Sequence, residues 1–295
     1  MAALAVAVVA VSTSAILIRW SGAPSVVKAF YRVLFTTALL LPWALGRYRG
    51  EFRTMELRDL GLAGLTGVAL ALHFVSWFES LNHTSVAASV TLVQTQPLFV
   101  AVGAWALLSE RLTRRMLAGI FVALFGAAVM SLGDPLLATL GIGDADALAG
   151  TGMLGNALAL VGAVTAAAYV LAGRSLRQRV SLVPYVVVVY VACAGVLFAI
   201  AVGQNAPLVD YPRHEWLLFL GMAVGPGIFG HTVINWALAH LESGVVSVSL
   251  LGEPVGSTVL ALLLLPGEIP TPTTVAGGAV VLLGIYLTAA ARNHG

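Results

Sequence analysis

The sequence has few charged residues. Asp, Glu, Lys and Arg together make up 9 % of its 295 positions, whereas soluble domains carry about 25 %. Hydrophobic residues account for 59 %, so the chain lacks the polar surface of a water-soluble globule. This composition also excludes intrinsic disorder and argues against nucleic acid as a partner. The single cysteine, Cys193, excludes a disulfide-rich secreted scaffold.

Several catalytic and cofactor motifs are also missing. No G-x-x-x-x-G-K-[ST] loop is present, so ATP does not drive this chain directly. No H-E-x-x-H segment, H-x-x-x-H pair or cysteine pair occurs, although a metal site needs three or four donor side chains. We therefore expect no enzyme, no metal and no cofactor.

Long apolar runs are abundant. Each is close to the roughly 20 residues that a helix needs to cross a bilayer. We expect helices because open strand edges are not tolerated in lipid. The sequence thus predicts an all-α membrane protein with ten transmembrane helices. The expected spans are 2–19, 24–45, 59–80, 84–107, 115–132, 152–172, 182–203, 215–240, 243–265 and 273–291.

The basic residues are distributed unevenly between the two sides that these spans define. Arg19, Lys28, Arg32 and Arg213 fall on one side. The other side also holds both termini. Cytoplasmic loops carry an excess of Lys and Arg, so we expect both termini in the cytoplasm and the chain in the cell (inner) membrane. The other side holds eleven of the fifteen basic residues: Arg47, Arg49, Arg53, Arg58, Arg111, Arg114, Arg115, Arg174, Arg177, Arg179 and Arg292.

The two halves of the chain resemble each other. The matches at an offset of 157, or 158 after a one-residue shift, pair His83 with His240, Pro97 with Pro254, Glu110 with Glu268, Gly119 with Gly277 and Gly126 with Gly284. We divide the chain into repeats 1–140 and 141–295 with five helices each. Because five is odd, the second repeat enters the membrane in the opposite orientation. Inverted repeats are common in secondary transporters, whose substrate site lies near the midplane.

Two stretches carry a family resemblance. Residues 73–113 contain H-F-x-x-W-x-x-S-L-x-x-T-S-V and L-L-S-E-R-L-T, and residues 230–268 contain G-H-T-x-x-N-W-A-L, V-S-x-S-L-L-G-E-P-V and L-L-L-L-P-G-E. These stretches resemble the EamA-type repeats of the drug/metabolite transporter superfamily, in particular its ten-helix exporters such as the YddG-type aromatic amino acid exporters. The resemblance covers almost the whole chain and implies export of small organic metabolites, most of all amino acids, with aromatic ones favoured.

Polar groups within the expected spans are the candidate substrate contacts, because such groups usually face a cavity or a partner. Glu253 is followed by Pro254, which we expect to kink the helix. Glu253 then binds a substrate amine, carries a proton, or is a neutral packing residue. In the first repeat, Gln96 takes the equivalent position before Pro97 and forms a polar wall or a helix contact.

Two basic residues share one face of the second span, because they are four residues apart. We expect Lys28 to extend to the membrane interface. Arg32 lies deeper, and we expect it to attract a substrate carboxylate or to pair with Glu79.

A histidine and an aromatic residue recur in both repeats. His73 and Trp77 lie in the third span, and His231, Asn235 and Trp236 lie in the eighth. The histidines line a cavity or bond between helices, and the indoles stack on a flat or cationic substrate or pack in the core. Tyr169 in the sixth span is a further candidate.

Glycines suggest close packing and one hinge. Gly225, Pro226 and Gly227 interrupt the long eighth span, and such interrupted segments mark transport sites. The other glycines predict faces where helices approach closely: Gly61, Gly64, Gly67, Gly119, Gly126, Gly277 and Gly284.

The expected function is therefore a carrier that alternates access to a central cavity between the repeats. Its expected partners are a small-molecule substrate, an amino acid or similar metabolite, and the lipid bilayer, and we expect a monomer. A drug or quaternary-ammonium exporter is the alternative, followed by an intramembrane enzyme or a scaffold. Proton coupling and uniport both remain open.

Overall fold

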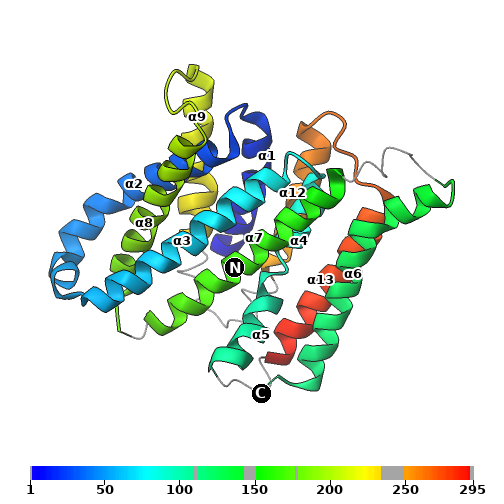
Figure 1. Cartoon of the computed structure of the whole chain (residues 1–295), viewed down its shortest axis with the longest axis horizontal. Coiled ribbons are helices and arrows are strands. Elements are labelled where there is room, and N and C mark those ends of the chain that lie inside the picture. Colours follow the sequence, from blue (N-terminus) through cyan, green and yellow to red (C-terminus); the bar gives the residue numbers. More distant parts are fainter. Residues whose placement is uncertain (1, 109–111, 143–150, 177–178, 234–248, 293–295) are drawn as a thin grey trace.

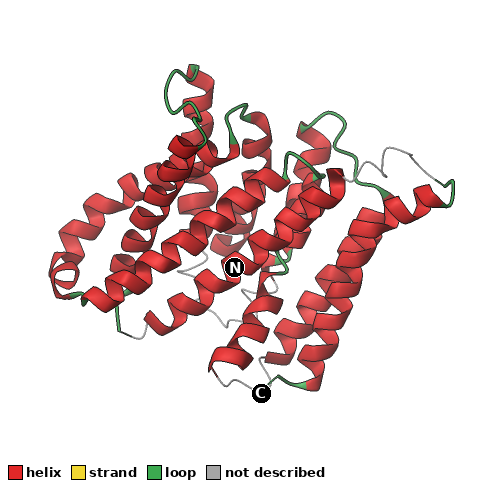
Figure 2. Ribbon diagram, viewed as in Figure 1, coloured by secondary structure: helices red, strands yellow, loops and turns green. Residues whose placement is uncertain are grey.

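The computed structural model describes residues 2–108, 112–142, 151–176, 179–233 and 249–292. These residues form helices joined by short loops, without a strand among them (Figure 2). Seven helical stretches within them are long and apolar enough to cross a membrane, and two shorter apolar helices accompany these. The all-α membrane architecture predicted from the sequence is confirmed.

The described helices follow the expected spans. The fourth and eighth spans are each divided in two. The elements are α1 (Ala2–Trp20), α2 (Ser25–Thr54), α3 (Leu57–Ser80), α4 (Val86–Val93), α5 (Gln96–Leu108), α6 (Arg114–Thr139), α7 (Thr151–Leu176), α8 (Leu182–Gly203), α9 (Arg213–Met222), the π-helix η2 (Ala223–Thr232), α12 (Gly252–Leu264) and α13 (Pro272–Arg292).

Helix α2 is longer than the sequence predicts. The apolar run ends near residue 45, but the helix continues to Thr54 with one non-helical residue, Tyr48, at φ −122°. The added turns carry exposed Arg47, Arg49 and Arg53. Hydropathy marks where the apolar run ends, but a helix of charged residues can continue into the interface, so the boundary was wrong by two turns.

The helices run between two ends of the molecule, which we call the upper and lower faces after Figure 1. Residues 21–24, 81–85 and 265–271 form connections at the upper face, and residues 55–56 and 179–181 form connections at the lower face. Helix α2 packs against α8, and α3 packs against α7 and α8. Helices α6 and α13 lie side by side, and α13 also packs against α4.

Helices α6 and α13 meet through glycines. A Cβ on Gly119 would lie 2.8 Å from the carbonyl oxygen of Gly284, and a Cβ on Gly126 would lie 2.7 Å from that of Gly277. The expected small faces are therefore confirmed for these four residues, which are the fifth-helix glycines of the two repeats. Gly67 likewise contacts α8.

The same expectation was wrong for Gly61 and Gly64. A Cβ at either position would meet nothing within 4 Å. A G-x-x-G spacing in a helix places glycines near one face, but it does not show whether another helix covers that face.

The glycine contact predicts a difference between two Gly→Ala substitutions. A Cβ on Gly126 would lie 2.6 Å from the backbone nitrogen of Val281. Overpacking of this kind costs about 1–3 kcal/mol, so we expect Gly126→Ala to lower the unfolding temperature in detergent. Gly61→Ala is the matched control, for which we expect no loss. Equal unfolding temperatures for the two variants would contradict this packing.

Candidate functional site

Helices begin inside the expected fourth and ninth spans, directly at the two matched prolines. Helix α4 ends at Val93, α5 begins at Gln96, and Pro97 is its second residue. Helix α12 begins at Gly252, and Pro254 is its third residue. Proline is favoured in the first turn, where its missing N–H has no helical partner. The helical path is interrupted at Leu251, three residues before Pro254; whether the proline acts as a kink during transport stays a prediction.

Glu253 lies in the first turn of α12, where the helix dipole stabilises negative charge. The residue is 8 % exposed. Its carboxylate Oε2 accepts a hydrogen bond of 2.5 Å from Nε2 of Gln94. The carboxylate is thus held between the two repeats, at the point where both of their helices are interrupted.

Gln94, not its neighbour Gln96, meets this carboxylate. Gln94 is the residue that follows α4, and its side chain reaches α12 from the turn. Gln96 is the residue that matches Glu253 in the repeat alignment, but it lies half-buried at the start of α5. The repeat preserves the backbone break, whereas the contact across it comes from a residue two positions earlier.

Arg32 is buried among aromatic rings. It is 2 % exposed, and its Nη1 donates a hydrogen bond of 3.1 Å to Ser14 Oγ. Its guanidinium carbon lies 4.8 Å from the ring centroid of Phe74, 5.7 Å from that of Phe78 and 6.0 Å from that of Trp77. Cation–π contacts at such distances are favourable.

No carboxylate forms an ion pair with Arg32 within the described part of the chain. The expected alternative, Glu79, instead accepts hydrogen bonds of 3.2 Å from Asn82 and His83. Arg32 and Glu253 are both buried. The site therefore combines a buried guanidinium and a buried carboxyl group that are not in direct contact within the described residues.

His73 and Trp77 lie beside this guanidinium on α3. Their rings are stacked, with centroids 5.9 Å apart and an interplanar angle of 18°. His73 Nδ1 is 2.9 Å from the carbonyl oxygen of Gly162 on α7 and donates to it, which leaves Nε2 as an acceptor. Trp77 is 5 % exposed, and its Nε1 lacks a hydrogen-bond partner among the described residues. A buried indole N–H without a partner is uncommon.

The remaining candidates are Tyr169 and three residues of the expected eighth span. Tyr169 is half-buried on α7 and packs against the main hydrophobic core. The side chain of His231, and Asn235 and Trp236 entirely, lie outside the described residues. Their predicted roles stay predictions.

The segment Gly225-Pro226-Gly227 lies in the π-helix η2. The helix therefore changes its hydrogen-bond spacing here instead of ending, which accommodates a proline that has no N–H to donate. Gly227 packs closely on α2, since a Cβ there would lie 2.8 Å from Thr36 Oγ1. Whether this segment acts as a hinge stays a prediction.

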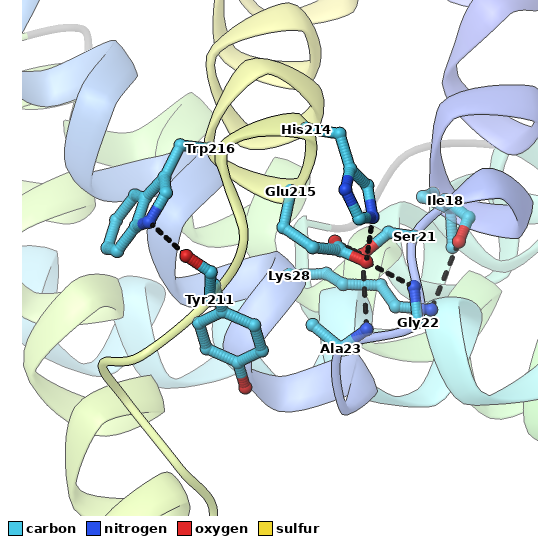
Figure 3. A network of polar contacts seen from close by, with 9 residues as sticks. All are labelled: Ile18, Ser21, Gly22, Ala23, Lys28, Tyr211, His214, Glu215 and Trp216. Atoms are coloured by element: carbon cyan, nitrogen blue, oxygen red, sulfur yellow. Dashed lines mark hydrogen bonds and ion pairs between the residues drawn. The ribbon is translucent and has the colours of Figure 1, made fainter.

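Lys28 does not extend to the interface. It is 3 % exposed, and its Nζ donates a hydrogen bond of 3.0 Å to the carbonyl oxygen of Ile18 in the last turn of α1 (Figure 3). A lysine at this place satisfies a carbonyl that has no helical partner. The expectation of a snorkelling side chain was wrong because the end of α1 offers a nearer acceptor than the headgroups.

The upper face contains an open cavity of ≈ 430 Å³. Arg19 and Glu268 line it and form an ion pair that joins the end of α1 to the α12–α13 loop. Glu268 also accepts a hydrogen bond of 3.2 Å from the backbone N–H of Val86. The rest of the wall is mostly polar: Asn82, His83, Thr84, Ser85, Asp134, Gly152, Gly267, Ile269, Thr271 and Thr274.

Sequence reasoning missed three residues of the central group: Ser14, Phe74 and Phe78. Phe74 could have been found, because it lies three residues before Trp77 on one helical face. Ser14 lies in a long apolar run with no distinguishing pattern.

Comparison with known proteins gives consistent matches over the whole chain. The family model of the EamA-like transporter family matches residues 1–132 and 153–290. An uncharacterized transporter of Archaeoglobus fulgidus is 26 % identical over 272 residues, 90 % of this chain and 88 % of that protein. A solved crystal structure with 23 % identity has a TM-score of 0.64 and covers 99 % of this chain and 97 % of that one, which shows the same fold.

Two relatives have more specific names. A probable terminal-alkyne amino-acid exporter of Streptantibioticus cattleyicolor is 26 % identical, over 80 % of this chain and 74 % of that protein. A pseudopaline exporter of Pseudomonas aeruginosa is 25 % identical, over 88 % of this chain and 84 % of that protein.

Proposed function

Because the chain belongs to the EamA-like transporter family, we propose that it exports small organic metabolites, most of all amino acids, by alternating access to a cavity between its repeats. The observation that carries this proposal is the buried pair of opposite charges, Arg32 and Glu253. An amino acid presents a carboxylate and an ammonium group, so it matches this pair in charge. The Arg32 guanidinium would bind the carboxylate, and Glu253 would bind the ammonium.

The aromatic residues around Arg32 support an apolar substrate side chain, with aromatic amino acids favoured. Phe74, Trp77 and Phe78 surround the guanidinium, and their rings can stack on a flat group. The relative named as an amino-acid exporter supports the same substrate class. The unpartnered Trp77 N–H and the free acceptor of His73 add polar contacts at the site.

We further propose that the lower face is cytoplasmic, that both termini lie there, and that a monomer in the inner membrane carries out transport. The exposed arginines of the α2 extension support this orientation, because cytoplasmic loops are rich in Arg and Lys. The cavity next to Arg19 and Glu268 would then open on the side where the substrate is released.

The alternative is an exporter of organic cations. A lone buried carboxylate would favour it, but the site also contains the buried guanidinium of Arg32. An uncompensated cation would therefore meet the buried guanidinium, which would repel it.

Counterflow in proteoliposomes tests the proposal and its alternative together. Purified protein is reconstituted and loaded with unlabelled phenylalanine, leucine or tetraphenylphosphonium, and each preparation is given the same compound in labelled form outside. We expect accumulation of both amino acids, more of phenylalanine, and no accumulation of the cation. Accumulation of the cation alone would support the alternative, and no accumulation in any case would contradict a carrier for these substrates.

The unpartnered indole N–H predicts the effect of Trp77→Phe. Removal of a buried donor that has no partner costs no hydrogen bond in the folded protein, so we expect little change in unfolding temperature. If substrate accepts this hydrogen bond, the Michaelis constant for phenylalanine rises by roughly 5- to 10-fold, as for a net hydrogen bond of about 1 kcal/mol. Tyr286→Phe, at an exposed position of α13, is the control. An unchanged Michaelis constant would exclude the contact.

A further inference from the structure

Two buried carboxylates lie at matching places in the two repeats. Asp59 is the third residue of α3, the third helix of the first repeat, and Glu215 is the third residue of α9, which begins the third helix of the second. They are 5 % and 4 % exposed. Because the repeats are inverted, Asp59 lies at the lower face and Glu215 at the upper face.

Each carboxylate contacts the opposite repeat just before the second helix of that repeat. Glu215 accepts hydrogen bonds from Ser21 Oγ at 2.5 Å and from the backbone N–H of Gly22 at 2.7 Å (Figure 3). Asp59 Oδ1 forms an ion pair of 3.1 Å with Nη2 of Arg179. Gly22 lies three residues before the start of α2, and Arg179 lies three residues before the start of α8.

A third residue lies in the first turn of the helix that follows each contact and packs back on the preceding helix. Lys28, the fourth residue of α2, reaches back to the last turn of α1. Tyr185, the fourth residue of α8, reaches back toward the end of α7, where its hydroxyl would lie 2.5 Å from a Cβ on Gly173. The carboxylate, its partner and the residue that reaches back thus form a similar arrangement at each face. The arrangement is repeated, but the residue types differ.

We propose that Asp59 and Glu215 are paired positioning residues whose contacts both stay closed throughout the transport cycle. This proposal rests on the alternating access proposed above. Gates that alternate would be closed at one face and open at the other, whereas both of these contacts are closed in one structure. Opening either would also leave a buried carboxylate without its partners, which is strongly unfavourable.

The contacts hold the helices that form the central site. Asp59 fixes the start of α3, which carries His73 and Trp77, and Glu215 fixes the start of the helix that continues into the Gly-Pro-Gly segment. The Arg19–Glu268 pair differs from both, because it borders the upper cavity and Arg19 is 29 % exposed. Arg19–Glu268 is therefore the contact that opens, while the two carboxylate contacts position the helices.

Spin-label distances in nanodiscs test this proposal without altering the carboxylates. All label pairs are introduced in a Cys193→Ala background. The first pair, Trp20→Cys with Arg213→Cys, spans the Glu215 contact at the upper face. The second, Arg58→Cys with Ser181→Cys, spans the Asp59 contact at the lower face, and the third, Trp20→Cys with Ile269→Cys, spans the Arg19–Glu268 pair. All five labelled positions are exposed. Each pair is measured with and without phenylalanine, and again with Glu268→Gln, which breaks the ion pair whether or not phenylalanine is a substrate.

We expect the third pair to gain a longer distance with Glu268→Gln, while the first two pairs keep one narrow distance under every condition. A second distance in either of the first two pairs would overturn the proposal.

Cross-linking provides a second test of whether the two contacts stay closed during transport. After a bis-maleimide joins the cysteines of the first or second pair, counterflow of labelled phenylalanine should continue at no less than half the uncross-linked rate. A block by either cross-link would overturn the proposal. If the Cys193→Ala parent moves no phenylalanine, the proposed function fails, and the distances alone decide on the two contacts.

Discussion

Replacement of Arg32 by methionine should abolish amino acid transport without unfolding the protein. Loss of one partner of a buried charge pair costs about 2–5 kcal/mol of binding, so counterflow of phenylalanine should fall at least about 30-fold. The fold should tolerate the change, because Arg32 has no ion pair within the described residues and a charge in the membrane interior costs about 3 kcal/mol. We therefore expect the variant to remain folded.

Two variants accompany this prediction. Arg49→Met removes an exposed arginine from the α2 extension and should leave transport unchanged. Arg32→Lys keeps the charge but loses the planar group that stacks on Phe74, so we expect partial transport. Wild-type counterflow by Arg32→Met would show that the guanidinium does not bind the substrate.

Replacement of Glu253 by glutamine should weaken transport of amino acids selectively. Glutamine has the same shape and can still bond to Gln94 through its carbonyl oxygen. The ammonium group of the substrate loses a charged partner, worth about 1.5–3 kcal/mol, so phenylalanine counterflow should fall roughly 10- to 100-fold. Inhibition by 3-phenylpropionate, which has no amine, should not weaken.

The control for Glu253→Gln is Glu56→Gln, which removes an exposed carboxylate before α3 and should have no effect. An equal loss of phenylalanine transport and 3-phenylpropionate inhibition in Glu253→Gln would mean that the whole site is disturbed. The carboxylate would then have a structural role and not bind the amine.

The fold was largely predictable from the sequence because each span is a separate apolar run of membrane length. The glycines of α6 and α13 were also predictable, since the repeat places them at equivalent positions. The end of α2 and the breaks at Gln94 and Gly252 were not. Hydropathy is high on both sides of each break, so it cannot distinguish a helix that bends at proline from one that begins there.

The candidate site was predictable in its charges and less so in its contacts. Ionisable residues are rare enough in the spans that Arg32 and Glu253 were evident from their types alone. Their neighbours depend on the packing of distant helices: Ser14 on α1 and Phe74 on α3 contact Arg32, and Gln94 bonds to Glu253. Lys28 was misjudged for the same reason, because its acceptor belongs to another helix.

The central claim is that the buried guanidinium and carboxylate bind the two charged groups of one amino acid. The most direct measurement is competition against labelled phenylalanine in counterflow by three compounds: phenylalanine, 3-phenylpropionate without the amine, and phenethylamine without the carboxylate. If Arg32 and Glu253 each bind one group, phenylalanine competes at least roughly 10-fold better than either analogue. Competition by phenethylamine equal to that of phenylalanine would contradict the claim, because it would show that no carboxylate is bound.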